Sequence, residues 1–161
     1  MRIVVMSDTH RCFSGLDKII QRNPDADLYI HLGDGDDDVD RAILKYPSIA
    51  PKIFHVAGNC DSGSMSQSEL ILTLEGGHKL IAAHGHQYGV KMTLGGIKRA
   101  ASEYGCDIIL YGHTHVRYNS YEDGFYILNP GSASCPHDGN KPSFGLIDVS
   151  ENGVVMNIAD I

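Results

Sequence analysis

Seven side chains that can bind a metal ion occur in five short polar motifs along the chain. They are Asp8, His10, Asp34, Asn59, His84, His113 and His115. Free imidazole is costly to bury without partners, and it is the commonest metal ligand in proteins. A single pair such as His113-Thr114-His115 is more often part of a polar loop than of a metal site, because isolated motif matches are frequently false. The five motifs therefore have to be weighed together.

Two metal ions explain this set of donors better than one. A cation with about four to six ligands cannot use all seven side chains, whereas two cations sharing one carboxylate can. Mixed imidazole and oxygen donors favour Mn²⁺, Fe, Co, Ni or Zn²⁺ over Ca²⁺ or Mg²⁺. No thiolate is required, so a closed structural zinc site is not expected. Paired metals attract phosphate oxygens and activate a bridging water, which predicts phosphoester hydrolysis by attack of a metal-bridging hydroxide.

Each motif directly follows a run of apolar residues that is typical of a buried strand. The runs cover residues 3–6, 27–31, 52–56, 78–83 and 107–110. Ligand sites in α/β sheets lie outside the carboxyl ends of the strands. If these strands share a sheet, all five motifs meet at one edge. Five such coincidences favour a common site over five unrelated loops.

Three helices and three hairpins complete the prediction. One helix follows Ser14 as its N-cap, a second begins with the carboxylates at 36–38, and a third ends at Gly105. The hairpins cover residues 70–83, 118–128 and 144–158, with turns at 76–77, 123–124 and 152–153, and 129–132 is expected to be a turn. Strands alternate with helices early and form hairpins later. This pattern predicts a mixed α/β domain whose strands form two packed layers.

Composition limits the classes of protein that fit. A chain of 161 residues with 42% apolar and 20% charged residues is expected to form a single domain, residues 1–161. The net charge of -7 argues against a nonspecific nucleic-acid or anionic-membrane surface. The four cysteines form no Cys-x-x-Cys pair, and we interpret them as reduced thiols. No signal peptide or membrane span is expected, and the predicted location is the cytoplasm.

The motifs, in this order, resemble those of the calcineurin-like metallophosphoesterases. They read Asp-x-His from residue 8, Gly-Asp from 33, Gly-Asn-x-Asp from 58, His-Gly-His from 84 and Gly-His-x-His from 112. The match runs from residue 3 to about 132. It looks closest to the small single-domain bacterial and archaeal phosphodiesterases, which share Gly-Asn-Cys-Asp and a late Asn-Pro-Gly-Ser. The resemblance implies a four-layer α/β/β/α sandwich of two mixed β-sheets flanked by helices.

The resemblance also implies how the donors divide between two divalent transition-metal ions (Mn, Ni, Fe, Co or Zn). One ion would be held by Asp8, His10, Asp34 and His115. The other would be held by Asp34, Asn59, His84 and His113, so Asp34 would bridge the two.

Some positions depart from the family pattern or lie outside the metal ligands. Many relatives carry a histidine after the asparagine, where it acts on the leaving group, whereas this chain has Cys60. Cys60 is a candidate catalytic residue, but it could equally be a redox-sensitive thiol or a packing residue, and we favour the last. His86 is a second catalytic candidate that could contact the substrate phosphate, or it is a loop histidine. Asp38 stands where phosphatase members have an arginine, which leaves Arg11 as a substitute or a surface residue. Asp61 is expected to orient an imidazole.

The resulting prediction is a metal-dependent phosphodiesterase acting on a small phosphodiester. A phosphomonoesterase is the nearest rival among enzymes. A nuclease is less favoured, because the sequence shows no basic or aromatic track for a polymer. A noncatalytic interaction scaffold with the same fold is the alternative from another class. The oligomeric state is left open, and a homo-oligomer is compatible with the sequence.

Overall fold

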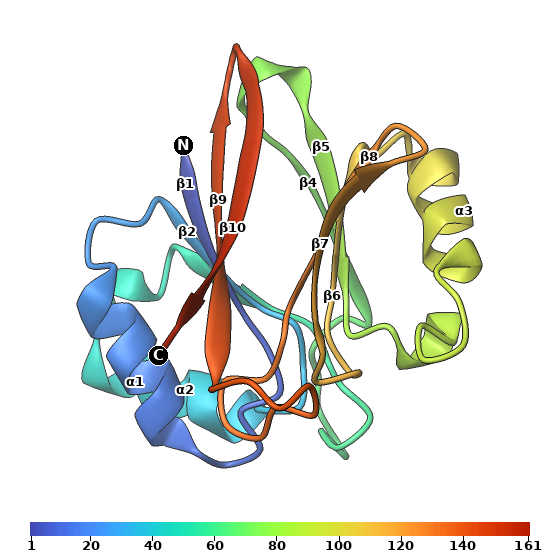
Figure 1. The fold of residues 1–161 in the computed structure, drawn as a ribbon. Helices are drawn as coiled ribbons and strands as arrows, with labels where there is room; N and C mark the ends of the chain where they lie inside the picture. The colour runs from blue at the N-terminus through green and yellow to red at the C-terminus, as the bar shows by residue number, and fades with distance from the viewer.

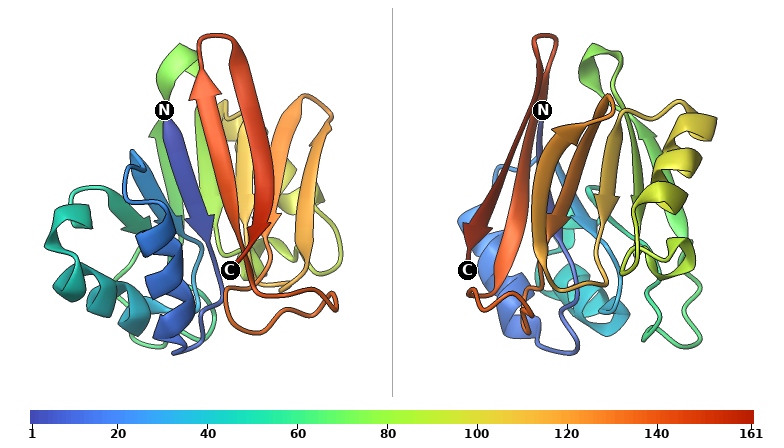
Figure 2. Two further views of the ribbon diagram at one scale, coloured as in Figure 1. Left: turned by 60° about the vertical axis from the view of Figure 1, so that its left-hand side comes forward. Right: turned by 45° about the vertical axis from the view of Figure 1, so that its right-hand side comes forward.

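Two mixed five-stranded β-sheets lie face to face, with helices on their outer faces, in the computed structural model of residues 1–161 (Figures 1 and 2). The first sheet has the order β10-β9-β1-β2-β3, with the strands Gly153–Asp160, Ser143–Ser150, Arg2–Met6, Leu28–His31 and Ile53–His55. The second has the order β4-β5-β6-β8-β7, with the strands Glu69–Thr73, Lys79–Ala83, Ile108–Tyr111, Phe125–Pro130 and Arg117–Glu122. The predicted four-layer α/β/β/α sandwich is confirmed.

The five polar motifs leave two different sheets rather than one. Strands β1, β2 and β3 run parallel in the first sheet, and β5, β6 and β8 run parallel in the second. The single shared sheet considered from sequence is therefore wrong. The motifs still meet, because the backbone N–H of His113, after β6, donates to the Asp8 carboxylate, after β1, at 3.1 Å. The candidate site thus lies between the ends of two facing sheets.

Strand periodicity divides the core into three layers. In β1, Ile3 and Val5 point between the sheets, whereas Val4 and Met6 point toward the helices of the first sheet. In β5, residues 80 and 82 face the first sheet, and residues 81 and 83 face the helix on the other side. Successive side chains of a strand point to opposite faces, so a strand covered on both faces is apolar throughout. This explains the uninterrupted apolar runs that precede the polar motifs.

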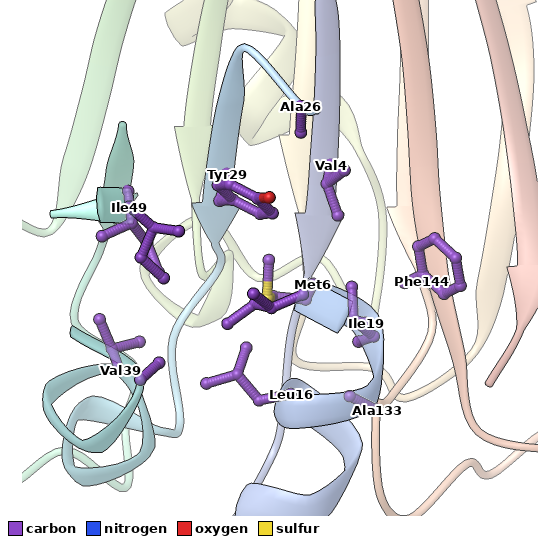
Figure 3. Close-up of a cluster of buried hydrophobic side chains, with 13 residues drawn as sticks. Val4, Met6, Leu16, Ile19, Ala26, Tyr29, Val39, Ile49, Ala133 and Phe144 are labelled. Carbon is purple, nitrogen blue, oxygen red and sulfur yellow. The ribbon is translucent and has the colours of Figure 1, made fainter. Parts of the chain in front are cut away.

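The helices cover the outer faces with apolar stripes. Helices α1 (Phe13–Arg22) and α2 (Asp36–Lys45) pack on the first sheet, and α3 (Gly95–Tyr104) packs on the second (Figure 1). Figure 3 shows Leu16 and Ile19 of α1 and Val39 of α2 gathered around Met6. Three short 3₁₀ segments, Pro47–Ile49 (η1), Glu75–Gly77 (η2) and His86–Tyr88 (η3), complete the elements. No helix is long and apolar enough to cross a membrane.

One predicted helix start and one predicted hairpin turn differ from the structure. Helix α1 begins at Phe13 after Cys12 rather than after Ser14, because a turn in which Cys12 N donates to Thr9 O at 2.8 Å brings the chain into the helix early. The hairpin of β4 and β5 is confirmed, but its connection is η2 rather than a two-residue Gly-Gly turn. The third helix ends as predicted, with Gly105 in the left-handed conformation.

Two further turns fall at different residues. The β9–β10 turn consists of residues 151–152, because Ser150 pairs with Gly153 across the ladder. The expected turn at 129–132 is wrong in its first half. Asn129 and Pro130 belong to β8, where they pair with Tyr118 and Arg117 of β7. Pro130 is the last residue of β8 and has no partner in β6, so its missing N–H interrupts no pairing with that strand.

Candidate metal centre

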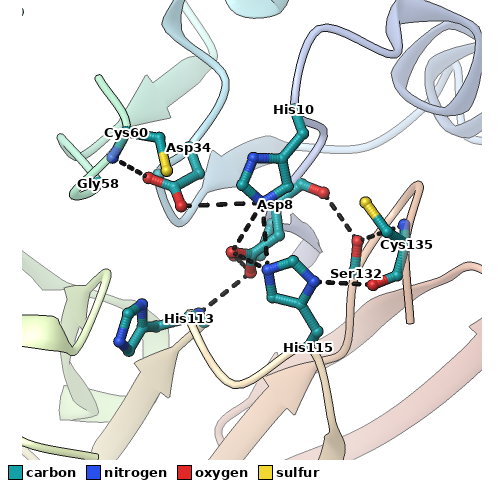
Figure 4. Close-up of polar contacts among 12 residues, drawn as sticks. Asp8, His10, Asp34, Gly58, Cys60, His113, His115, Ser132 and Cys135 are labelled. Carbon is teal, nitrogen blue, oxygen red and sulfur yellow. Dashed lines mark hydrogen bonds and ion pairs between the residues drawn. The ribbon is translucent and has the colours of Figure 1, made fainter. Parts of the chain in front are cut away.

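The seven side chains predicted to bind metal converge where the loops after β1, β2, β3, β5 and β6 meet. In the first group, the Nε2 atoms of His10 and His115 lie 3.1 Å apart, and Asp8 Oδ1 lies 3.1 Å from the His115 nitrogen. The same Asp8 oxygen lies 3.9 Å from His10 Nε2, and Asp34 Oδ2 lies 3.8 Å from it. Figure 4 shows these four side chains pointing toward one another from three loops.

The second group is centred on His84. Its Nε2 atom lies 3.1 Å from Asn59 Oδ1, 3.1 Å from His113 Nδ1 and 3.4 Å from Asp34 Oδ2. Asp34 Oδ2 is therefore close to both groups, which is the position a bridging carboxylate needs. The other oxygen, Oδ1, accepts the backbone N–H of Cys60 at 2.7 Å and so points away from both groups.

Two histidines are held with one ring nitrogen turned toward the site. Nδ1 of His84 donates to the carbonyl oxygen of Leu32 at 2.7 Å, and Nδ1 of His115 donates to the carbonyl oxygen of Cys135 at 2.7 Å. This tautomer leaves the lone pair on Nε2, and metal-binding histidines are usually fixed in this way. Asp8 is oriented likewise: its Oδ2 accepts from Ser7 Oγ at 2.5 Å, and its buried Oδ1 has no hydrogen-bond partner.

Two carboxylates stay ionised in this buried volume. Burial by itself would raise the pKa of Asp8, but the close approach of His115, the nearby His84 and the Ser7 hydroxyl lower it. Burial also opposes ionisation of Asp34, yet its contacts with His84 and the Cys60 backbone N–H hold its pKa well below the usual range. Burial lowers the pKa of His113 to about 4, with a contribution from the neighbouring His84, so its ring is neutral at pH 7.

This charge balance fits divalent cations. Asp8 is fully buried and Asp34 is 3% exposed, and two buried anions need compensating positive charge. Asp8 Oδ1 offers an unpaired lone pair at the point where the imidazole nitrogens converge. Donor atoms of Asp8, Asp34 and His84 lie within 4.8 Å of one another, as do those of Asp8, His10 and His115. The donor set is that of a borderline transition metal.

The backbone at these residues is strained. Seven non-glycine residues have positive φ, and five of them are candidate ligands: Asp8 (55°), His10 (47°), Asp34 (59°), His113 (66°) and His115 (57°). A left-handed conformation costs a non-glycine residue about 1–2 kcal/mol. Such strain persists where the surrounding structure enforces it, which is characteristic of functional sites. The strain therefore supports a role beyond loop formation.

Two glycines let the loops approach one another. A Cβ atom on Gly58 would overlap Asp34 Oδ1, and one on Gly112 would overlap Ser7 Oγ and lie 3.0 Å from Asp8 Oδ2. Any side chain at either position would push the carboxylate it faces out of place. The glycine in front of Asn59 and the one in front of His113 are thus explained by close packing.

Asp61 does not orient an imidazole, contrary to the expectation from sequence. Its Oδ2 accepts the backbone N–H groups of Asp34 and Gly58 at 2.7 and 2.8 Å, and its Oδ1 accepts those of Gly35 and Asp36 at 2.9 and 3.2 Å. Histidine rings are oriented instead by backbone carbonyl groups. Asp61 therefore ties the loop after β3 to the loop after β2, and so places Asn59 beside Asp34.

The two catalytic candidates lie beside different candidate ligands of the centre. Cys60 is exposed, so the favoured interpretation as a packing residue is wrong. Its Sγ accepts from Asn59 Nδ2 at 3.3 Å, and it groups with donor atoms of His10 and Asp34 within 4.8 Å. His86 begins η3 and is exposed, with its ring centre 5.4 Å from that of His84.

Sequence reasoning missed the residues that support the loops carrying His113 and Asp8. Asn129 is fully buried, and its Nδ2 donates to the carbonyl oxygen of Gly112 at 2.9 Å and to Thr114 Oγ1 at 3.0 Å. Ser132 Oγ donates to the carbonyl oxygen of Asp8 at 2.7 Å. The signal was the polar pair flanking Pro130-Gly131, which was interpreted only as a turn.

An acidic cavity of about 670 Å³ opens beside the centre. His10, Asp34 and Cys60 are among the residues that line it. Its lining also includes four further carboxylates, those of Asp36, Asp37, Asp40 and Asp61. Arg11 also lines it, but its Nε lies 3.8 Å from Asp37 Oδ2, which offsets its charge. The cavity can therefore accept a neutral or cationic group more readily than an anionic one.

Comparison with known proteins confirms the resemblance. The calcineurin-like phosphoesterase superfamily domain matches residues 1–152. The probable metallophosphoesterase YsnB of Bacillus subtilis is 30% identical over 161 residues, which cover 99% of this chain and 91% of that protein. Phosphodiesterase YfcE of Escherichia coli is 30% identical over 121 residues, 69% of this chain and 59% of that protein. The structure of vacuolar protein sorting 29 from Cryptosporidium parvum shares the fold, with a TM-score of 0.83 at 19% identity over 99% of this chain and 91% of that one.

Proposed function

Because this chain belongs to the calcineurin-like phosphoesterase superfamily, we propose that it hydrolyses small phosphodiesters with two divalent cations. The observation that carries the proposal is a pair of buried, ionised carboxylates facing four imidazoles, with Asp34 Oδ2 near both His10 and His84. Paired divalent cations, when bound, supply Lewis acidity to the phosphoryl oxygens and a water of lowered pKa.

The proposed roles of the residues follow from these contacts. Asp8, His10 and His115 would hold one cation, and Asn59, His84 and His113 would hold the other, with Asp34 shared. Backbone carbonyl groups keep His84 and His115 aimed at the site, so binding needs little reorganisation. We propose that the exposed ring of His86, whose centre lies 6.0 Å from that of His113, contacts the substrate phosphate.

The acidic cavity supports a diester rather than a monoester. A phosphodiester carries one negative charge, whereas a monoester carries nearly two at neutral pH. The carboxylates of Asp36, Asp37 and Asp40 repel the additional charge, and the cavity offers room for a second ester group. The relative named phosphodiesterase YfcE supports the same choice.

Hydrolysis of bis(p-nitrophenyl) phosphate and p-nitrophenyl phosphate with added Mn²⁺ or Ni²⁺ tests the proposal. We expect a higher kcat/KM for the diester, and a loss of about 10²–10³-fold in the His84→Ala variant, the size seen on removing one charge-stabilising group. His78→Ala is the matched control, because that imidazole pairs with Asp107 at the opposite end of the second sheet. Absence of hydrolysis with every divalent metal in a folded sample would refute the proposal.

A noncatalytic scaffold is the second candidate, favoured by the fold shared with vacuolar protein sorting 29. The presence of all seven candidate ligands, five of them at strained positive φ, supports the enzyme. Cells carrying Asp34→Asn distinguish the two: normal behaviour with intact partner binding would support the scaffold, and loss of function would support the enzyme.

A further inference from the structure

We propose that Cys60 is an additional ligand of the cation at His10, so that this position prefers thiophilic metals such as Co²⁺, Zn²⁺ or Cd²⁺. The inference rests on the proposed metal centre. It adds a sulfur donor to a set in which the sequence required none.

The geometry places the sulfur among other donors. Cys60 Sγ, a ring nitrogen of His10 and a carboxylate oxygen of Asp34 all lie within 4.8 Å of one another. Bonds of about 2.0–2.3 Å allow donors of one cation to lie up to about 4.5 Å apart. The Cys60 side chain is exposed, so a cation from solvent can reach its sulfur.

A second observation points to a cation at this place. Asp8 Oδ1 is buried without a hydrogen-bond partner, and it lies 3.9 Å from His10 Nε2. This unpaired oxygen therefore lies beside His10, which also belongs to the group of Cys60 and Asp34. His10, Asp34 and Cys60 also line one cavity, so an ion from solvent can reach all three.

Asn59 links the sulfur to the rest of the centre. Its Oδ1 lies 3.1 Å from His84 Nε2, and its Nδ2 donates to Cys60 Sγ at 3.3 Å. The backbone N–H of Cys60 donates to Asp34 Oδ1 at 2.7 Å. The Asn59 side chain would therefore contact the cation at His84 through its oxygen, while its NH₂ group holds the Cys60 thiol near the cation position at His10. The backbone contact with Asp34 holds both residues in register.

The difference between the two positions is one of ligand softness. The His84 position has only nitrogen and oxygen donors, which suit Mn²⁺ and similar ions. The His10 position gains a thiolate, which selects softer cations. Binding converts the thiol to a metal thiolate and releases one proton to solvent, so charge and atoms balance.

Anaerobic titration of the metal-free full-length chain with Co²⁺ tests the inference through the near-ultraviolet thiolate-to-cobalt absorption band. We expect the band in the wild type and in Cys135→Ser, and its loss in Cys60→Ser. Cys135 is the matched control, because it is exposed and lies next to the centre through its carbonyl group. We also expect the Cys60→Ser substitution to lower the ratio of Co²⁺ affinity to Mn²⁺ affinity about 10–100-fold.

A band that persists in Cys60→Ser, or an unchanged ratio of Co²⁺ to Mn²⁺ affinity, would overturn the inference. If the wild type binds Mn²⁺ and hydrolyses the diester but shows no thiolate band, the inference fails and the proposed function stands. If no variant binds any divalent cation, both fail. Equal melting temperatures of the metal-free proteins verify that Cys60→Ser remains folded.

Discussion

Replacing Asp61 with asparagine should loosen the centre without removing a candidate ligand. The Asp61 carboxylate accepts four backbone N–H groups, two on each oxygen, from the loops after β2 and β3. Asparagine has the same shape but only one side-chain oxygen. Two N–H groups therefore lose their acceptor and face an NH₂ group instead.

The magnitude follows from the number of bonds. A hydrogen bond to a charged group contributes about 1.5–3 kcal/mol, so losing two costs about 3 kcal/mol at the lower end, which suits a partly exposed carboxylate. For a chain of this length, 1 kcal/mol shifts the melting temperature by about 2–4 °C. The metal-free Asp61→Asn protein should therefore melt about 6–12 °C lower than the wild type. Its Mn²⁺ affinity should fall about 10–100-fold, because Asn59 and Asp34 are no longer held together.

The assay is thermal unfolding in chelator, followed by calorimetric titration with Mn²⁺. Asp40→Asn is the matched control, since Asp40 lines the same cavity and is exposed, and we expect its melting temperature and affinity to match the wild type. If Asp61→Asn melts within about 2 °C of the wild type and binds Mn²⁺ equally well, the four hydrogen bonds do not fix the site and this reasoning is wrong.

Three further predictions concern the ligands, a buried histidine and a close contact. The His113→Ala and His115→Ala variants should each bind one ion fewer than the wild type by elemental analysis, and the double variant should bind none. A double variant that still binds one ion would contradict the division into two metal positions. Burial lowers the pKa of His31 to about 4, so the unfolding free energy of the metal-free protein should fall by up to about 1.4 kcal/mol per unit as pH drops from 6.5 toward 4. Urea denaturation at pH 7 and 5 should show a smaller fall in His31→Asn, and an equal fall would refute this. Gly112→Ala should lower the unfolding free energy by about 1–3 kcal/mol, because the added Cβ would overlap Ser7 Oγ. Gly95→Ala is the control, since its Cβ would meet only Thr93 Oγ1 at 3.7 Å. Equal melting curves for the two variants would count against the close contact at Gly112.

Much of the site could be predicted from sequence because each donor follows an apolar strand. A strand covered on both faces has to be apolar throughout, so a sudden Asp or His marks the point where the chain leaves the core. This rule located Asp8, Asp34 and His84, and the spacing of the motifs carried the family resemblance. The acidic first turn of α2 and the stop at Gly105 could be predicted as well, because both depend on local backbone electrostatics and conformation.

Only the tertiary structure decided which atoms face the site. Asp8 and the loop of His113 are 105 residues apart in the chain, yet their hydrogen bond leaves Asp8 Oδ1 free and occupies Oδ2. Whether Asp61 holds backbone or imidazole, whether Cys60 is buried or exposed, and whether one sheet or two supply the loops all depend on such long-range packing. A sequence records residue types and local spacing. The direction of a side chain at a strained loop is set by partners distant in the chain, and the amino-acid order alone does not specify it.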